Sequence, residues 1–158
     1  MAERKAKATS IFKTNSPGET GLAARALAAA LGGGETVFLY GPIGSGKTTF
    51  VKALAAALGA PEPASASFSL MREYRSRKIR LFHADFFRLS DGEIAEMGLE
   101  TAFEDPASVF VAEWPEPLKE FAPKDRLELE FSLLSGDGRR IAVRALGPKS
   151  RKLAEVFK

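Results

Sequence analysis

The feature that most constrains how this chain can fold is residues 41–48, which read Gly-Pro-Ile-Gly-Ser-Gly-Lys-Thr and match G-x-x-x-x-G-K-[ST] at every fixed position. A short apolar run, residues 37–40, precedes the motif, as expected of a strand buried on both faces of a parallel sheet. An amphipathic helix follows, with Val51, Leu54 and Leu58 on one face. A buried strand, a glycine-rich loop and a helix in this order form a P-loop. The sequence therefore predicts an α/β fold of the P-loop NTPase class, with a mostly parallel central sheet flanked by helices.

The P-loop motif also predicts how a nucleotide is bound. Its glycines let successive backbone N–H groups turn inward around phosphate oxygens, and the helix that begins near Lys47 directs its positive dipole end to the same place. Lys47 neutralises the β- and γ-phosphates, and the Thr48 hydroxyl is a ligand for Mg2+. ATP is favoured over GTP because the only asparagine, Asn15, precedes the loop, so the Asn-Lys-x-Asp pattern that reads guanine is missing. We expect ATP and Mg2+ as cofactors, with nucleotide contacts from Gly41, Ile43, Gly44, Ser45, Gly46, Lys47, Thr48 and Thr49.

The other periodicities predict a single P-loop ATPase domain over residues 1–158. A capping box of Ser16, Pro17 and Glu19 starts a helix that runs to about Leu31, where three glycines end it. Strands are expected at 68–74, 79–84 and 109–112, a short helix from Ser90 or Asp91 to Met97, and an antiparallel C-terminal hairpin with one wet face at 127–133 and 141–145. We expect residues 1–10 and 149–158 to be flexible tails.

Composition excludes several classes of function. With no cysteine and one histidine, the chain has no disulfide, no thiolate chemistry and no multi-histidine metal site. The net charge of +3 is spread along the chain and does not indicate any particular class of binding partner. The longest apolar stretch, residues 22–31, is too short to cross a bilayer, and no apolar segment follows the N-terminal charges. We therefore expect a cytoplasmic protein with no membrane contact.

Two carboxylates stand where a P-loop protein places its metal site. Asp85 ends the strand expected at 79–84, and Glu113 ends the strand at 109–112. Ligands of open α/β sheets bind outside the carboxyl ends of the strands. Asp85 is thus a candidate Walker B residue that holds Mg2+ directly or through water. Glu113 is a candidate second metal ligand, or the group that orients the attacking water, because the chain has no glutamine for that role. The plain alternative for each is a solvated carboxylate at a strand end.

Four further residues have two readings each. Ser67, in an Ala-, Pro- and Ser-rich loop, is either a switch whose hydroxyl reaches the γ-phosphate or metal, or a turn residue. His83 is more readily explained as a packed histidine than as a catalyst, and Arg88 as a surface ion pair than as a phosphate ligand. Trp114 either packs on the nucleotide site or fills its rim.

Taken in order, these segments resemble one family. With the P-loop, they are Ser-Ala-Ser-Phe at 65–68, Glu-Tyr at 73–74, His-Ala-Asp-Phe-Phe-Arg-Leu at 83–89 and Glu-Trp-Pro-Glu at 113–116. From about Ser16 to Arg144 the chain closely resembles the TsaE (YjeE) family, small bacterial P-loop ATPases needed for threonylcarbamoyladenosine formation in tRNA. The resemblance places Lys47 and Thr48 at phosphate and Mg2+, Ser67 at the switch threonine, Asp85 in a Walker B-like segment and Glu113 near the metal.

Three departures from the family pattern concern the switch rather than the nucleotide. Ser-Ala-Ser-Phe replaces Ser-Pro-Thr-Phe and loses a stiff proline. Pro42 and Ile43 replace an Asp-Leu pair and remove an acidic group beside the phosphates, and Phe87 replaces a tyrosine and deletes a phenol. The departures leave the P-loop lysine and threonine and both carboxylates in place, so nucleotide binding is expected to survive while switch timing differs.

By resemblance, the protein binds and hydrolyses ATP while docked on TsaD in a complex with TsaB, and it reaches tRNA only through that complex. Hydrolysis is expected to be slow without partners because no arginine finger is evident. Two other functions stay open, a small-molecule P-loop kinase and a nucleotide-dependent binding module without meaningful hydrolysis. Direct RNA binding by basic tails is less favoured because aromatic residues do not interleave with most of these charges: Arg4, Lys5, Lys7, Lys149, Arg151, Lys152 and Lys158.

Overall fold

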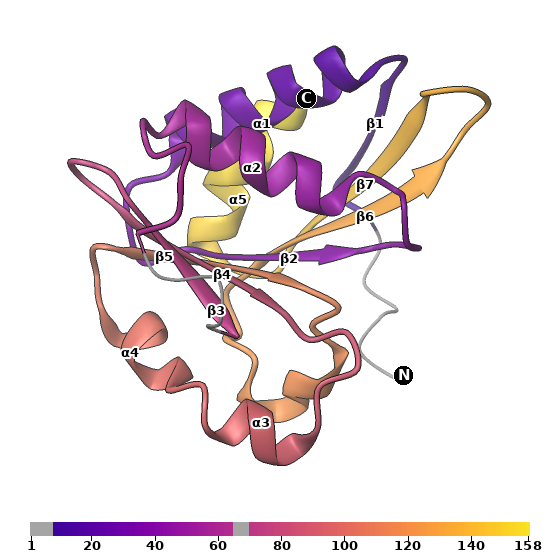
Figure 1. Cartoon of the computed structure of the whole chain (residues 1–158). Coiled ribbons are helices and arrows are strands. Elements are labelled where there is room, and N and C mark those ends of the chain that lie inside the picture. Colours follow the sequence, from indigo (N-terminus) through magenta and orange to yellow (C-terminus); the bar gives the residue numbers. More distant parts are fainter. Residues whose placement is uncertain (1–7, 65–69) are drawn as a thin grey trace.

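A single seven-stranded sheet organises the computed structural model, which describes residues 8–64 and 70–158 (Figure 1). The spatial order of the strands is β1-β7-β6-β2-β5-β4-β3. The four central strands β6, β2, β5 and β4 run parallel; at the sides, β7 pairs antiparallel with β6, β1 antiparallel with β7, and β3 antiparallel with β4. The predicted fold class, with its parallel centre and antiparallel C-terminal hairpin, is confirmed. The strands are β1 Ser10–Thr14, β2 Thr36–Tyr40, β3 Met71–Arg75, β4 Arg80–Asp85, β5 Ser108–Glu113, β6 Leu127–Leu133 and β7 Arg139–Ala145.

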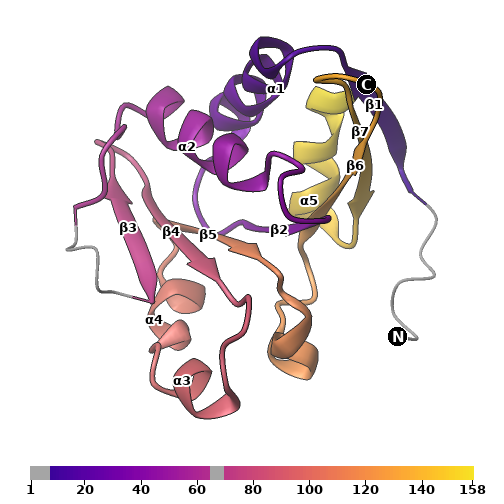
Figure 2. The same cartoon turned by 45° about the vertical axis from the view of Figure 1, so that its right-hand side comes forward.

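Helices cover both faces of this sheet. Figure 2 shows α1, α2 and α5 on one side and α3 and α4 on the other. The elements are α1 Pro17–Ala30, α2 Lys47–Ala57, α3 Asp91–Ala95, α4 Leu99–Glu104 and α5 Pro148–Ala154, with 3-10 turns η2 Glu116–Phe121 and η3 Glu155–Phe157. The predicted start of α1 is confirmed, because the Ser16 hydroxyl accepts a hydrogen bond from the Glu19 N–H at 3.1 Å. No helix in these described ranges is long and apolar enough to cross a membrane.

The alternation of side chains along the central strands produces two cores. In β2, Val37 and Leu39 join the core beneath α1, α2 and α5, whereas Phe38 joins the core beneath α4 and η2. In β5, Val111 and Phe110 divide in the same way. Because both faces are covered, these strands are continuous apolar runs, which is why they were recognisable in the sequence.

The prediction that residues 149–158 form a flexible tail is wrong. This segment forms most of α5 and all of η3, and Leu153 and Phe157 are buried in the main core. The Phe157 ring lies 5.8 Å from the Phe12 ring in an edge-on contact. The Asp125 carboxylate accepts hydrogen bonds from the first turn of α5, from the N–H groups of Lys149 and Ser150. The basic residues of this segment occupy its outer face. Its apolar side chains, Leu153 and Phe157, are four residues apart and pack toward the sheet.

The remaining differences between the predicted and the observed elements concern mainly the outer parts of the fold. Strand β1 begins at Ser10, within the segment expected to be a tail, and β1, α4 and η2 had no counterpart among the expected elements. The hairpin does not have a fully wet face, because Glu128 is buried and pairs with Arg126 at 2.9 Å. The strand expected at 68–74 is described from Met71, and residues 65–69 lie outside the described part of the chain.

Candidate nucleotide-binding site

The glycine-rich loop links the carboxyl end of β2 to the first residue of α2, Lys47. Gly41, Gly44 and Gly46 all have positive φ, at 138°, 80° and 99°. This left-handed backbone strains residues with a side chain, so the loop needs glycine at these turns. At Gly41 a Cβ atom would also lie 2.6 Å from the carbonyl oxygen of Phe131 on β6. The glycines of the motif are therefore required by the path of the chain before any ligand is considered.

The remaining loop residues differ in exposure. Ile43 is 71% exposed at the loop's surface, and Thr49 is exposed in the first turn of α2. Ser45 is fully buried, and its hydroxyl has no hydrogen-bond partner among the residues that the structure describes. A buried hydroxyl without a partner, next to the turns of the glycine-rich loop, suits a loop that encloses a polar group.

The lysine of the motif is held inside this loop. Lys47 is only 4% exposed, and its Nζ donates hydrogen bonds to the carbonyl oxygens of Gly41 and Pro42 at 2.7 and 2.9 Å. The same atom lies 4.7 Å from the centre of the Trp114 ring. Burial lowers the pKa of Lys47, against the opposing charges of Glu113, Asp85 and Glu116. The ammonium group is thus positioned at the loop, where a phosphate would meet it.

Glu113 is the buried centre of a chain of three polar side chains. It is 3% exposed at the end of β5, and its carboxylate accepts a hydrogen bond from the Thr48 hydroxyl at 2.9 Å. Its other oxygen lies 2.7 Å from His83 Nε2. Burial by itself raises the pKa of Glu113, but the hydrogen bond and charge of His83, the Thr48 hydroxyl and the Lys47 charge together hold that pKa below its ordinary value. The carboxylate is therefore ionised at neutral pH.

Asp85 ends the neighbouring strand. The parallel register of β4 and β5 pairs its backbone with that of Glu113. Asp85 is exposed, and its Oδ1 accepts a hydrogen bond from the Phe87 N–H at 2.9 Å. A cavity of about 190 Å3 joins both carboxylates to Thr48 and is lined by Thr48, Leu70, Arg72, His83, Asp85 and Glu113. The structure thus brings together three residues that the sequence identified separately.

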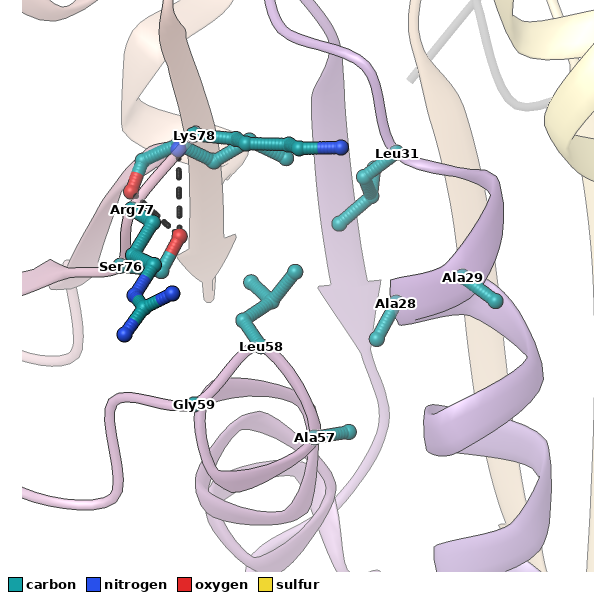
Figure 3. Close-up of a pocket in the computed structure, with 10 residues that line it drawn as sticks. Ala28, Ala29, Leu31, Ala57, Leu58, Gly59, Ser76, Arg77 and Lys78 are labelled. Carbon is teal, nitrogen blue, oxygen red and sulfur yellow. Dashed lines mark hydrogen bonds between the residues drawn. The ribbon is translucent and has the colours of Figure 1, made fainter.

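A second cavity, of about 430 Å3, lies elsewhere. Figure 3 shows its lining at the carboxyl ends of α1 and α2, with Leu31, Leu58 and the turn that carries Arg77 and Lys78. Since α2 has 11 residues, this end is about 16 Å from the P-loop at 1.5 Å per residue. None of the residues predicted from the sequence lines this cavity, so the candidate site is the one beside Thr48.

Arg139 is a site residue that sequence reasoning missed. From the first position of β7, its Nε donates to the carbonyl oxygen of Ser45 at 2.9 Å, and a terminal nitrogen lies 3.4 Å from the carbonyl oxygen of Gly44. A third contact, at 2.8 Å, goes to Gly138. The guanidinium therefore restrains two successive carbonyl groups of the loop. No local pattern marks this residue, because 94 positions separate it from Ser45.

The other candidates form a cluster beside Lys47. Trp114 and Arg88 have positive φ values of 52° and 61°, which are strained for residues with side chains. The Phe87 ring lies 4.9 Å from that of Trp114, and the Arg88 guanidinium stacks over Phe87 at 4.9 Å. His83 contacts Glu113, and Trp114 contacts the P-loop lysine, as described above. Ser67 lies outside the described residues.

The oxygen donors at the site fit Mg2+ that arrives with a nucleotide. Thr48, Asp85 and Glu113 present a hydroxyl and two carboxylates to one cavity. Across residues 8–64 and 70–158, no group of three or more His, Cys, Asp or Glu side chains is placed to hold a metal ion unaided. Mg2+ typically keeps several waters and takes one or two carboxylates together with phosphate oxygens. The residues thus suit a metal site completed by phosphate.

Comparisons with known proteins agree with this geometry. The family model of the threonylcarbamoyl adenosine biosynthesis protein TsaE matches residues 14–141. The tRNA threonylcarbamoyladenosine biosynthesis protein TsaE of Bacillus subtilis is 32% identical over 145 residues, which cover 91% of this chain and 90% of the relative. The protein of the same name from Aquifex aeolicus is 36% identical over 123 residues, which cover 76% of this chain and 84% of the relative. The crystal structure of Bacillus subtilis YdiB matches with a TM-score of 0.77 at 30% identity, covering 94% of this chain and 93% of that one. The chain therefore belongs to the TsaE family.

Proposed function

We propose that this protein binds ATP with Mg2+ at the P-loop and hydrolyses it as an accessory to threonylcarbamoyladenosine modification of tRNA. The observation that carries the proposal is the hydrogen bond from the Thr48 hydroxyl to the buried carboxylate of Glu113, which His83 also contacts. It joins the hydroxyl that ends the P-loop motif to an ionised carboxylate on a neighbouring strand. The proposal draws its biological setting from the TsaE family, whose model matches most of the chain.

In this mechanism the loop binds the phosphates. Its backbone N–H groups and Lys47 take the phosphate oxygens, and the lysine exchanges its bonds to Gly41 and Pro42 for bonds to the nucleotide. Thr48, Asp85 and Glu113 are the residues that would hold Mg2+, which when bound neutralises charge on the phosphates. The Trp114 ring over Nζ limits where the lysine can move.

Glu113 has a second role at the reacting water. Water attacks the γ-phosphorus, the bond from that phosphorus to the β–γ bridging oxygen breaks, and the bridging oxygen leaves on ADP. Because its pKa is held low, Glu113 accepts a hydrogen bond from the water at neutral pH and orients it, and the proton passes to the released phosphate. The contact from His83 Nε2 at 2.7 Å keeps the carboxylate in place.

The proposed partners are TsaD and TsaB, which would raise a slow intrinsic rate. The Arg139 guanidinium is already engaged, because it donates a hydrogen bond to a carbonyl group of the loop. Partner binding is proposed to add charge that stabilises the transition state, beside Arg72, which lines the cavity with Thr48 and Glu113. Contact with tRNA is proposed to occur only through that complex.

The test is steady-state ATP turnover by the purified protein, alone and with purified TsaD and TsaB. We expect low turnover alone, a rise with the partners, and loss of both in Lys47→Ala. Glu113→Gln is expected to lower the partner-stimulated rate by about 100-fold or more, a usual range for losing such a group. Glu130→Gln is the matched control, because Glu130 is a partly exposed carboxylate paired with Arg144 on the hairpin.

Two results would redirect the proposal. Phosphate transfer to an added small metabolite instead of water would indicate a P-loop kinase. Unchanged turnover in Glu113→Gln, with ATP still required for partner binding, would indicate a nucleotide-dependent binding module.

A further inference from the structure

An apolar groove lies on the face of the sheet opposite α1 and α2. It has a volume of about 510 Å3 between α3, α4 and η2, and its apolar lining is Ile94, Leu99, Phe103, Pro117, Leu118 and Phe121. Phe121 is 75% exposed, the highest value among the large apolar side chains of the described ranges. Exposed aromatic side chains beside an apolar hollow are typical of protein interaction sites.

The rim of this groove is strongly acidic. Asp91, Glu100 and Glu120 line it, and all three side chains are exposed. The whole segment 91–120 contains nine carboxylates and one lysine, although the chain as a whole carries a net charge of +3. Such a field repels nucleic acid and anionic lipid and attracts a positively charged protein segment. The chemistry therefore selects a basic segment that also carries an apolar side chain.

Two short stretches of chain connect the groove to the nucleotide site. The chain that leaves β4 after Asp85 enters α3 at Asp91, and the chain that leaves β5 after Glu113 enters η2 at Glu116. Just after the two strand ends, Phe87 and Trp114 pack together, and Trp114 contacts Lys47. Figure 2 shows both connections running from the sheet toward α3 and the η2 segment. A partner seated in the groove would thus touch the two elements, α3 and η2, that follow the strand ends carrying Asp85 and Glu113.

We propose that this groove docks a positively charged segment of the TsaD–TsaB complex, with an apolar side chain inserted beside Phe121 and cations against the acidic rim. The inference rests on the proposed function and adds where the partner binds. Apolar insertion supplies affinity, and the rim charges supply orientation and the rate of association.

The test measures the affinity of the purified TsaD–TsaB complex for variants of the full chain by calorimetry, at low and at high salt. Phe121→Ala is expected to weaken binding by about tenfold or more, as for a central aromatic contact. The double variant Glu100→Lys with Glu120→Lys is expected to do the same at low salt and less at high salt. Because these side chains are exposed, folding and ATP affinity should be unchanged.

Matched controls remove the same chemistry elsewhere. Leu22→Ala deletes an apolar side chain that is 60% exposed on α1, and Glu62→Lys reverses an exposed charge in the described part of the loop after α2. Both should bind like the wild type. If the groove variants also bind like the wild type, the docking site is wrong while the proposed function stands.

Two other outcomes overturn the inference. If the wild type does not bind TsaD–TsaB at all, the partner assignment fails together with the groove. If the wild type instead self-associates and Phe121→Ala abolishes that association, the groove belongs to a second copy of this chain.

Discussion

Removing the Arg139 side chain tests whether the shape of the P-loop depends on a residue from the far end of the sequence. Phosphate binding requires the loop N–H groups to face inward, so the carbonyls between them must face outward. Arg139 holds two of these carbonyls, on Ser45 at 2.9 Å and on Gly44 at 3.4 Å. In Arg139→Ala these carbonyl groups lose this restraint. The binding of ATP must then order the loop, at a cost in affinity.

The expected size follows from the shorter contact. A hydrogen bond from a charged donor contributes about 1.5–3 kcal/mol, whereas the 3.4 Å contact is too long to add much. If that restraint is lost, the affinity for ATP should fall by roughly 10- to 100-fold at about 1.4 kcal/mol per tenfold change. Arg139→Lys can reach one carbonyl and should restore part of the loss.

The assay is calorimetric titration with ATP, in Mg2+ and again in EDTA, so that the contribution of the loop is measured with and without the metal. Arg144→Ala is the control, since it removes a guanidinium of the same charge from the same strand, one that forms an ion pair with Glu130 at 2.7 Å. ATP affinity in Arg139→Ala equal to that of Arg144→Ala would refute the reasoning.

Three further predictions concern the C-terminal helix. Phe157→Ala is expected to lower the free energy of unfolding by about 3–5 kcal/mol, because the ring is 4% exposed in the main core; urea denaturation showing a loss near zero would mean that this helix does not dock. Gly147→Ala should also destabilise, since its Cβ would lie 2.6 Å from Asp125 Oδ1, whereas Gly21→Ala in the middle of α1 meets no atom within 4 Å and should be neutral or stabilising. Burial raises the pKa of Asp125, but hydrogen bonds from Ser150 and Lys149 outweigh burial and hold this pKa below its ordinary value. The stabilisation by the Asp125 carboxylate is therefore fully present above about pH 4 and is lost as the pH falls through the lower pKa of the folded state. Unfolding measured against pH should therefore show a smaller acid loss in Asp125→Asn; identical pH profiles would contradict the capping role.

The parts of the fold that the sequence predicted are those with a strong local pattern. Strand β2 is a continuous apolar run, the P-loop is a fixed motif, and α2 repeats its apolar residues at helical spacing. The positions of Asp85 and Glu113 followed from strand ends that a parallel sheet brings to one edge. The local sequence pattern and the general topology of parallel sheets were therefore enough to predict that Asp85 and Glu113 lie close together.

What the sequence did not predict depends on contacts between distant segments. Arg139 reaches the loop only because β6 and β7 are added beside β2. The basic charge of the last ten residues concealed a short apolar face, although Leu153 and Phe157 stand four residues apart. Glu128 occupies a position that the alternation of the strand predicts to be exposed, yet it is buried and forms an ion pair with Arg126.

Trp114 also has an optical consequence. It is the only tryptophan of the chain, and its ring lies 4.7 Å from Lys47 Nζ and 4.9 Å from the Phe87 ring. Any nucleotide that draws the ammonium toward its phosphates changes the charge felt by this single indole. We therefore expect the emission of this indole to change when a nucleotide occupies the P-loop, so that binding can be followed without an attached dye.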